Sequence, residues 1–324
     1  MFGGDPMTNG DEFITFRTPP RERFAVILAG GDGVRMREMT KKLAGCETPK
    51  QFCAILGDDT LMTTTRKRVS LKFGPDETFY CLTQTHERFY TPLLGDVHRK
   101  NKIIQPSNQG TAPAILYSLL RLSKRSPEAI VAFFPSDHYI SDDQVFMDQV
   151  ETAFRSVAKK PEAVILMGIE PVAPKSSYGW IEPCGDLADF SVAEIQKVKL
   201  FWEKPTTKQA VDLMAKGSLW NSFVMVGKVK SLLGLFRKYL PALYRLFCAG
   251  SITFGTPVER MTISTIYRMV ASRNFSLDVL EKCADELYVL RCSGFAWSDL
   301  GEPREVLLKM AQLGLKNKLF PMAA

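Results

Sequence analysis

A buried strand that ends in a glycine-rich loop constrains this chain more than any other stretch. Phe24 to Leu28 is a run of five apolar residues, and glycines follow at positions 30, 31 and 33. Such a loop leaves backbone N–H groups at the carboxyl end of the strand with no Cβ atoms in the way, and Arg35 adds donors that suit phosphate. The stretch predicts a triphosphate-binding loop. The alternative is a tight strand-to-helix turn whose glycines serve only its geometry.

Two common nucleotide-binding motifs do not match this loop. A P-loop requires Gly-x-x-x-x-Gly-Lys-Ser/Thr, and no such run occurs in the chain. A dinucleotide-binding loop requires Gly-x-Gly-x-x-Gly, but Met36 stands where a third glycine would follow Gly31 and Gly33. A nucleotide must therefore be held here in another way.

Size and composition are those of an ordinary globular protein. The chain has 324 residues, of which 45% are hydrophobic and 24% charged. No apolar run reaches the length of about eighteen residues that a membrane span needs, so no membrane partner is expected. Residues 1–22 are polar and rich in Gly and Pro, which indicates a flexible tail rather than a secretory signal. We expect a single α/β domain over residues 23–324, with a largely helical part from about 228 onward.

Cysteine spacing and charge limit the cellular setting and the partners. The seven cysteines lie far apart and form no Cys-x-x-Cys pair, which favours free thiols in a reducing cytoplasm. The formal net charge of +7 suggests an anionic partner, either nucleotides or nucleic acid. Because no run of five Lys or Arg residues and no aromatic–basic pattern occurs, nucleic acid is not expected.

Two charged residues stand where they could act on a phosphate. Pro49 should hold the preceding residue extended and present Lys50 to the glycine loop, although most lysines are simply exposed. The strand predicted at Ile130–Phe134 leads directly to Asp137. Ligands bind at the carboxyl ends of strands in open α/β sheets, and Mg²⁺ prefers carboxylates together with substrate phosphates. Asp137 is therefore a candidate Mg²⁺ ligand, and its alternative role is that of a helix cap or turn residue.

A second loop follows another predicted strand. Lys102–Ile104 leads into Gln105–Gly110, and a helix is predicted over Thr111–Leu122, with Thr111 as a reasonable N-cap and Gly110 as its competitor. The amide of Gln105 can both donate and accept, and Gly110 allows close backbone approach. The loop is therefore suited to reading a planar base.

Carboxylates recur in Gly- or Pro-marked stretches farther along the chain. Glu182 and Glu203 stand in such stretches, where carboxylates can take bidentate contacts from sugar hydroxyls, and Lys204 can meet a phosphate on the sugar. Asn221 precedes a predicted strand and can serve a hydroxyl or form an Asx turn. Asp299 is a second acidic residue beside a glycine. The alternative for Glu182, Glu203 and Lys204 is a hairpin with exposed charges.

Together these motifs resemble those of the sugar-1-phosphate nucleotidylyltransferases, most of all the mannose-1-phosphate guanylyltransferases. Eight stretches match that family in its order, each at the end of a predicted strand. They are Leu28-Ala-Gly-Gly-Asp-Gly-Val-Arg35, Pro49-Lys-Gln-Phe52, Gln105-Pro-Ser-Asn-Gln-Gly-Thr-Ala-Pro-Ala114, Pro135-Ser-Asp-His138, Tyr178-Gly-Trp-Ile-Glu182, Phe201-Trp-Glu-Lys-Pro205, Leu219-Trp-Asn-Ser222 and Trp297-Ser-Asp-Leu-Gly301.

The resemblance implies a fold and a reaction. The fold is an α/β, Rossmann-like sandwich of three layers of the nucleotide-diphospho-sugar transferase (GT-A) type, with a mixed, mostly parallel sheet. The reaction transfers a nucleotidyl group from a nucleoside triphosphate, expected to be GTP, to a sugar-1-phosphate, expected to be mannose-1-phosphate. It gives GDP-mannose and pyrophosphate, with Mg²⁺ as cofactor and no covalent enzyme intermediate. Small-molecule substrates and a monomer or homodimer are expected.

The resemblance also assigns roles to single residues. The nucleotide would be held by Ala29, Gly30, Gly31, Gly33, Gln105, Gly110 and Thr111. The sugar phosphate would be held by Gly179, Glu182, Glu203, Lys204 and Asn221. Arg35, Lys50 and Asp137 would be the catalytic residues, with Arg35 on the leaving pyrophosphate and Lys50 on the α-phosphate. Asp137 and Asp299 would jointly hold the Mg²⁺ ion.

Three other functions stay open at this point. A regulatory protein of the same fold would bind a nucleotide or sugar nucleotide with weak or no catalysis, and the segment Met36–Thr48, which departs from the family pattern, motivates this alternative. A nucleotidylyltransferase could also serve another base or sugar. A glycosyltransferase of related architecture would carry an Asp-x-Asp metal motif after a strand, whereas Pro135-Ser-Asp-His138 holds a single aspartate.

Overall fold

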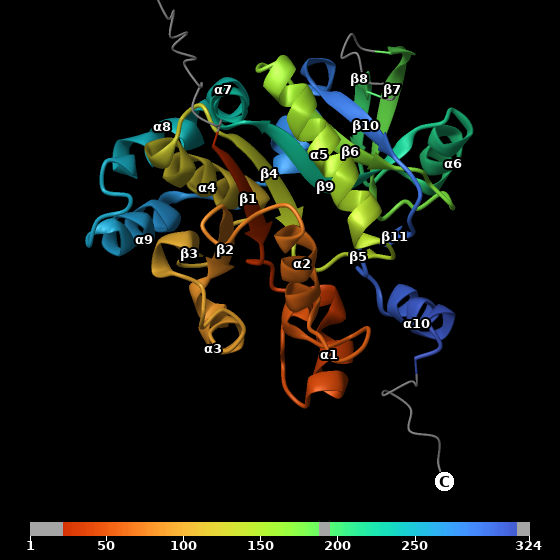
Figure 1. Cartoon of the computed structure of the whole chain (residues 1–324), viewed down its shortest axis with the longest axis horizontal. Coiled ribbons are helices and arrows are strands. Elements are labelled where there is room, and N and C mark those ends of the chain that lie inside the picture. The colour runs from red at the N-terminus through yellow and green to blue at the C-terminus, as the bar shows by residue number, and fades with distance from the viewer. Residues whose placement is uncertain (1–21, 188–194, 316–324) are drawn as a thin grey trace, which may run out of the picture.

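A nine-stranded mixed sheet forms the centre of the protein, with the strand order β3-β2-β1-β4-β9-β6-β10-β8-β7 (Figure 1). The computed structural model describes residues 22–187 and 195–315, so the expected tail at 1–22 lies almost wholly outside the described residues. The strands are β1 (Arg23–Leu28), β2 (Thr78–Thr83), β3 (Lys102–Gln105), β4 (Ile130–Pro135), β6 (Val164–Ile169), β7 (Gly179–Leu187), β8 (Ile195–Glu203), β9 (Leu219–Lys228) and β10 (Tyr288–Cys292).

Strand direction brings the loops of interest to one edge of the sheet. Strands β1 to β4 are parallel neighbours, so the loops that follow them leave the sheet at the same edge. Strand β9 runs antiparallel to both β4 and β6, and β8 runs antiparallel to β7 and β10. The other strands of this sheet point one way, as expected for a mixed, mostly parallel sheet.

Helices cover both faces of the sheet and give the predicted three layers. One face carries α4 (Thr111–Arg125), α7 (Val229–Tyr239), α8 (Pro241–Ser251) and α9 (Glu259–Met269), packed in one large apolar cluster with residues such as Phe133 and Leu166. The other face carries α2 (Leu61–Ser70), α5 (Asp143–Lys159) and α6 (Thr207–Ala215), packed in a second cluster. Figure 1 shows α5 crossing in front of the sheet.

A third, smaller cluster joins two helices from opposite ends of the chain. It packs α1 (Arg37–Ala44) against α10 (Pro303–Gln312), through Met36 and Met39 on one side and Val306 and Met310 on the other. Helix α1 lies within Met36–Thr48, the segment that departs from the family pattern. A helix forms there because Met36, Met39 and the half-buried Leu43 recur at helical spacing and face this cluster.

Prolines set two of the helix boundaries. Helix α3 (Glu87–Tyr90) stops before Pro92, and α7 and α8 are separated between Tyr239 and Pro241, because proline cannot continue a helix but is tolerated at the start of one. The short turns are η1 (Val34–Met36), η2 (Lys50–Phe52), η3 (Gln84–His86), η4 (Arg99–Asn101), the π-helical η5 (Ser276–Leu280) and η6 (Ala284–Glu286).

The part of the chain beyond residue 228 is more than a helical accessory. Strand β10 lies inside the sheet, where it pairs in parallel with β6 and antiparallel with β8. Among the described residues, none of the helices is long and apolar enough to cross a membrane.

Candidate active site

A cavity of about 360 Å³ opens at the carboxyl ends of the parallel strands. The glycine loop after β1 forms one side of it, and the start of α4 forms another. The cavity is lined by Leu28, Gly30, Gly31, Gly33, Gln51, Cys81, Gln105, Asn108, Gly110, Thr111, Ala114, Pro135, Ser136, Asp137, Phe223, Ser272, Arg273 and Asn274. All the predicted nucleotide-binding residues except Ala29 thus share one space with Asp137.

The carbonyl groups of the glycine loop are fixed by side chains from neighbouring elements. The Gln51 amide donates to the carbonyl of Ala29 (3.2 Å) and to that of Gly31 (2.8 Å). The Thr83 hydroxyl donates to the carbonyl of Gly30 at 3.0 Å. Among the described residues, no acceptor pairs with the N–H groups of residues 30–33. The loop therefore keeps a row of backbone donors available for an anion.

Two of the glycines are required by the geometry of the loop. A Cβ atom on Gly30 would lie 2.7 Å from Gln105 Nε2 and 2.8 Å from Thr83 Oγ1, which is closer than atoms can pack. Gly33 has a φ of +59°, in the left-handed region that glycine adopts readily. Ala29 differs from the glycines, because its own N–H donates to the carbonyl of Cys81 at 2.8 Å.

A small two-stranded sheet brings together the two predicted metal ligands, which are far apart in sequence. Strand β5 (Tyr139–Ile140) pairs with β11 (Trp297–Ser298), with Ser298 opposite Tyr139. The pair ends at Ser298 and Tyr139, which are the chain neighbours of Asp299 and His138. The loop that carries Asp137 and the loop that carries Asp299 therefore lie side by side.

Lys50 connects these two loops. The residue is only 7% exposed, and its Nζ lies 3.2 Å from Asp137 Oδ2 and donates to the backbone carbonyl of Asp299. Burial is the largest single effect on the Asp137 carboxyl and raises its pKa, but the Lys50 charge and hydrogen bond, together with smaller effects of His138 and the backbone, hold this pKa below its ordinary value. Lys50 is therefore a member of the site and not an exposed lysine.

Arg35 reaches the same cluster from η1. A Cβ atom added to Gly301 would lie 2.6 Å from Asp299 Oδ2 and 3.1 Å from Arg35 Nη2. The Asp299 carboxylate and the Arg35 guanidinium therefore both lie next to Gly301. Asp299 Oδ1 accepts the N–H of Gly301 at 2.8 Å. Arg35, Lys50, Asp137 and Asp299 thus form a single charged group next to the glycine loop.

This donor set fits a hard divalent cation. The described residues contain no group of three or more His, Cys, Asp and Glu side chains that could enclose a metal ion. Mg²⁺ does not need such an enclosure, because it commonly binds one or two carboxylates together with substrate phosphates and water. The adjacent loops of Asp137 and Asp299, beside free backbone donors for phosphate, match that mode of binding.

His138 supports the site without a charge of its own. Burial lowers the pKa of its imidazole to about 4, so the ring is neutral at pH 7. The ring packs edge-on against Trp297 of β11, with 5.2 Å between the ring centroids. His138 therefore helps to hold the β5–β11 pair together.

The predicted base-reading loop is held in place by its own side chains. Tyr267 donates its hydroxyl to Gln105 Oε1 at 2.7 Å, so the Gln105 amide packs beneath the glycine loop while it lines the cavity. Gly110, and not Thr111, is the N-cap of α4. The Thr111 hydroxyl instead accepts the N–H of Phe275 at 2.8 Å. Gly110 has a φ of +83°, and a Cβ atom there would strike the Arg273 carbonyl at 2.3 Å.

Three of the predicted sugar-binding residues lie together. A Cβ atom on Gly179 would lie 3.2 Å from Glu203 Oε2 and 3.3 Å from Asn221 Cβ. Burial raises the pKa of the Glu203 carboxyl, and Lys204 lies beside it with Nζ 3.7 Å from Glu203 Oε1. The Asn221 side chain forms an Asx turn, in which it accepts the N–H of Phe223 at 3.0 Å.

Glu182 is not brought to this group. In the β7–β8 pairing Gly179 lies opposite Glu203 and Glu182 lies opposite Leu200, so the alternation of a strand points the Glu182 side chain to the other face of the sheet. There its carboxylate pairs with Lys199 at 2.9 Å, and this hydrogen bond holds the pKa of Glu182 below its ordinary value.

Backbone strain is concentrated in the same region. The described non-glycine residues with positive φ are Lys204 (51°), Phe223 (59°) and Leu300 (49°). Phe223 lines the cavity, Lys204 adjoins Glu203, and Leu300 follows Asp299. Strained conformations of this kind persist where the surrounding structure fixes them, and they are common at functional sites.

Several supporting residues were not identified from the sequence. Asp32 of the glycine loop lies 3.1 Å from His86 Nε2 and accepts from Asn108 Nδ2 at 2.9 Å, so it ties the glycine loop to the base-reading loop. The Arg273 carbonyl accepts the N–H of Ala112 at 3.1 Å. Gln51 lies within a matched motif, but no pattern around His86 or Arg273 indicates these contacts.

Comparisons with known proteins agree with this geometry. The family model described as nucleotidyl transferase matches residues 24–314. Mannose-1-phosphate guanylyltransferase 2 of Escherichia coli O157:H7 is 29% identical over 288 residues, which cover 86% of this chain and 58% of that protein. Alginate biosynthesis protein AlgA of Pseudomonas fluorescens is 25% identical over 280 residues, which cover 85% of this chain and 56% of that protein.

Solved structures share the fold. The crystal structure of mannose-1-phosphate geranyltransferase from Thermus thermophilus aligns with a TM-score of 0.73 at 23% identity, over 88% of this chain and 79% of that chain. This likeness confirms the predicted Rossmann-like fold. The chain spans a little over half the length of the curated relatives that it matches.

Proposed function

The chain belongs to the nucleotidyl transferase family, and from this premise we propose that it transfers a nucleotidyl group from a nucleoside triphosphate to a sugar-1-phosphate. The proposed substrates are GTP and mannose-1-phosphate, and the products are GDP-mannose and pyrophosphate. The name of one relative, mannose-1-phosphate guanylyltransferase 2, supports this choice. All seven cysteines are free thiols, which supports a reducing cytoplasmic setting.

One observation carries the proposal. The Lys50 ammonium contacts both the Asp137 carboxylate and the Asp299 backbone, directly beside a loop whose backbone donors have no partner among the described residues. Two carboxylate-bearing loops, a buried cation and free N–H groups are the parts that a phosphoryl-transfer site needs, because its catalysis consists mainly of positioning and charge neutralisation.

Each residue has a distinct task in this scheme. The N–H groups of the glycine loop hold the triphosphate, and Arg35 binds the departing pyrophosphate. Lys50 turns from Asp137 toward the α-phosphate, where it stabilises the charge that develops as the sugar phosphate oxygen attacks in line. Asp137 and Asp299 would hold Mg²⁺, which when bound would screen the repulsion between the two phosphate groups.

The sugar end of the site is assigned to the group around Gly179. Glu203 and Asn221 lie next to the bare backbone of Gly179, where a sugar ring can approach without a Cβ atom in the way. The exposed Lys204 ammonium is available for the phosphate of the sugar. Glu182 lies on the other face of the sheet, so we assign it no contact with the same sugar.

A substrate panel tests the proposal. Pyrophosphate release is measured with four nucleoside triphosphates, each paired with several sugar-1-phosphates, with reactions lacking sugar phosphate as controls. We expect GTP with mannose-1-phosphate to exceed the other pairs by about tenfold or more in kcat/KM. If no pair releases pyrophosphate while GTP binds in calorimetry, the proposal is wrong and the chain is a nucleotide-binding regulator.

A further inference from the structure

A second cavity, of about 690 Å³, lies beside the edge strand β3 and is larger than the first cavity. Residues 98–106, from η4 and β3, form one wall, and residues 255–264, at the start of α9, form the opposite wall. Tyr117 and Arg121 of α4 lie between these walls. None of the residues assigned above to the nucleotide, the sugar or the metal lines this second cavity, so the proposed reaction does not account for it.

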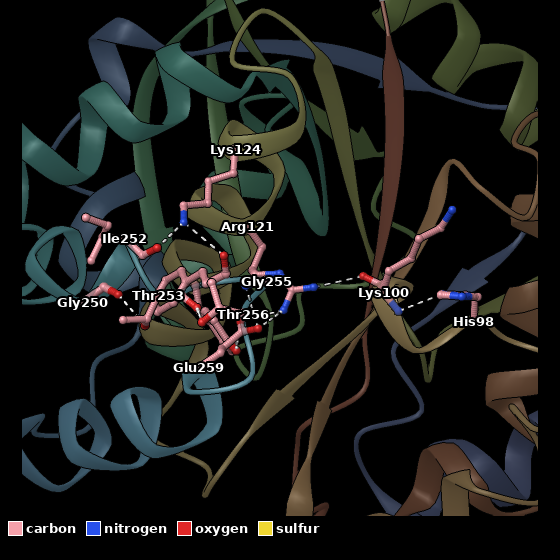
Figure 2. Close-up of polar contacts among 12 residues, drawn as sticks. His98, Lys100, Arg121, Lys124, Gly250, Ile252, Thr253, Gly255, Thr256 and Glu259 are labelled. Carbon is pink, nitrogen blue, oxygen red and sulfur yellow. Dashed lines mark hydrogen bonds and ion pairs between the residues drawn. The ribbon is translucent and has the colours of Figure 1, made fainter.

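The walls of the second cavity are tied together by a hydrogen-bonded framework. Glu259 Oε1 accepts the Tyr117 hydroxyl and Arg121 Nη1, each at 2.6 Å, and Glu259 Oε2 accepts the N–H of Gly255 at 2.9 Å. Arg121 extends to the other wall, where its Nη2 donates to the Lys100 carbonyl at 3.1 Å (Figure 2). The cavity is therefore built into the fold, and Glu259 and Arg121 are occupied in holding its walls.

The rest of the turn before α9 is fixed in the same way. Lys124 of α4 donates to the carbonyl of Ile252 at 2.7 Å and to that of Phe254 at 3.0 Å, and Figure 2 shows its side chain reaching toward the turn. Carbonyl groups at the end of a helix are commonly satisfied by such a lysine. The wall formed by residues 255–264 thus starts from a rigid turn.

The lining of the second cavity is strongly cationic. Five cationic side chains but only two acidic ones, Glu87 and Glu259, line it. Arg99, Lys102 and Arg260 have no ion-pair partner in the part of the chain that the structure describes. Arginine and lysine side chains that line one cavity without an ion-pair partner favour an anion, and arginine in particular matches the geometry of phosphate.

A buried hydroxyl in the second cavity lacks a partner as well. Tyr90 lines the cavity and is 3% exposed, and its hydroxyl has no hydrogen-bond partner within the described residues. Burial, with a smaller contribution from the Glu87 charge and an opposing one from Arg260, raises the pKa of this phenol to about 12. Buried polar groups are normally hydrogen-bonded, so this donor calls for an acceptor that the described residues do not supply.

The second cavity is connected to the nucleotide loop through α9 and β3. Ser264 lines the second cavity, and Tyr267, one turn farther along α9, donates to Gln105 beneath Gly30. Pro106 lines the second cavity while its neighbour Gln105 lines the first. A molecule in the second cavity would therefore touch the same elements that hold the glycine loop.

We propose that the second cavity is a binding site for a phosphorylated small molecule. Its phosphate lies among Arg99, Lys102 and Arg260 and accepts the Tyr90 hydroxyl. Its apolar or aromatic part packs on the side chains of the lining residues Ile104 and Ile263. Occupancy acts on the nucleotide loop through α9. This site is separate from the proposed transfer reaction and does not depend on it.

Hydrogen–deuterium exchange on the full chain tests the site without any need for catalysis. The probes are guanosine monophosphate, mannose-1-phosphate and inorganic phosphate, each added alone. We expect at least one probe to slow amide exchange across residues 98–106 and 255–264. Protection by the nucleotide alone assigns a nucleoside phosphate, protection by the sugar phosphate alone assigns a sugar phosphate, and protection by all three assigns the phosphate group as the recognised part.

Variants separate this site from the first cavity. In the double variant Arg99→Ala/Arg260→Ala we expect the apparent Kd of the protecting probe to rise about tenfold or more. The exposed Arg155→Ala on α5 is the matched control and should leave the Kd unchanged. Tyr90→Phe should also weaken binding, yet it should not lower the Tm of the unliganded protein, because the hydroxyl it removes has no partner there. The proposal is wrong if no probe protects these segments, or if protection survives in the double variant.

Discussion

At the scale of single residues, the ion pair between Lys50 and Asp137 shows how burial and charge are balanced. Two nearby effects act on the Asp137 carboxyl in opposite directions, because burial raises its pKa and the Lys50 ammonium lowers it. The Lys50 ammonium prevails only together with smaller effects of His138 and the backbone, so the pKa of Asp137 is lowered in the free protein. The ion pair with Asp137 holds Lys50 in place before the substrate arrives. When a triphosphate enters, it offers a second anion that the Lys50 ammonium can contact.

Lys50→Met tests this balance through its pH dependence. Because the folded pKa of Asp137 lies below its ordinary value, the pair stabilises the fold above about pH 4, and that contribution is lost as the pH falls through the lowered pKa. We expect Lys50→Met to lower the free energy of unfolding by about 1–3 kcal/mol at pH 7 and by progressively less as the pH falls below about 4, as measured by urea denaturation.

Lys228→Met is the matched control for this variant. The Lys228 and Lys50 side chains are equally buried, at 8% exposed each, but the partner of Lys228 is Glu128, whose side chain is 58% exposed and can be solvated. Its loss should leave pyrophosphate release intact, whereas Lys50→Met should lower it. Equal pyrophosphate release by the two variants would contradict the assignment of Lys50.

At the scale of elements, the glycine loop works because its neighbours fix its carbonyl groups. The donors come from η2, through Gln51, and from the end of β2, through Thr83. With the carbonyls fixed, the N–H groups are left for the ligand. The strand β1 and its loop were predictable, because a buried apolar run and three glycines are local signals, whereas the residues that pin the loop come from elsewhere in the chain.

A pair of alanine substitutions separates packing from binding in this loop. Gly30→Ala should lower the Tm by several degrees, because the added methyl meets Gln105 and Thr83 at less than a packing distance. Gly31→Ala should leave the Tm unchanged, since no atom lies within 4 Å of its added Cβ, but should raise the KM for GTP about tenfold by occupying the space of a phosphate. Equal effects on Tm would show that the loop is not held as described.

The features that could not be predicted from the sequence all depend on contacts between distant parts of the chain. Helix α1 buries only a narrow stripe of methionines in a small satellite cluster, so its segment reads as polar. The Glu182 and Glu203 side chains lie on opposite faces because of the β7–β8 register, which local sequence does not determine. The hydrogen bond of Gln105 to Tyr267 joins residues 162 positions apart, and no local pattern can indicate it.

At the scale of the whole molecule, the fold brings residues that are far apart in sequence into one charged site. Asp137 follows a central strand, and Asp299 comes from beyond β10, near the other end of the described chain. The β5–β11 pair and the packing of His138 on Trp297 join the two loops, and α10 with α1 supports them from the third cluster. The sequence indicated both aspartates singly, but their convergence depends on the complete topology.

The assignment of the two carboxylates is tested most directly by the rate of pyrophosphate release from GTP and mannose-1-phosphate in the variants Asp137→Asn and Asp299→Asn. We expect the rate of each variant to fall by about a hundredfold or more while the protein stays folded, and the exposed Asp212→Asn on α6 to retain the full rate. Asp299→Asn should keep the Tm of the parent protein, whereas Asp137→Asn should lower it by several degrees because it removes the partner of the buried Lys50 ammonium. Near-parental rates in both variants would contradict the assignment of these two carboxylates to the catalytic site.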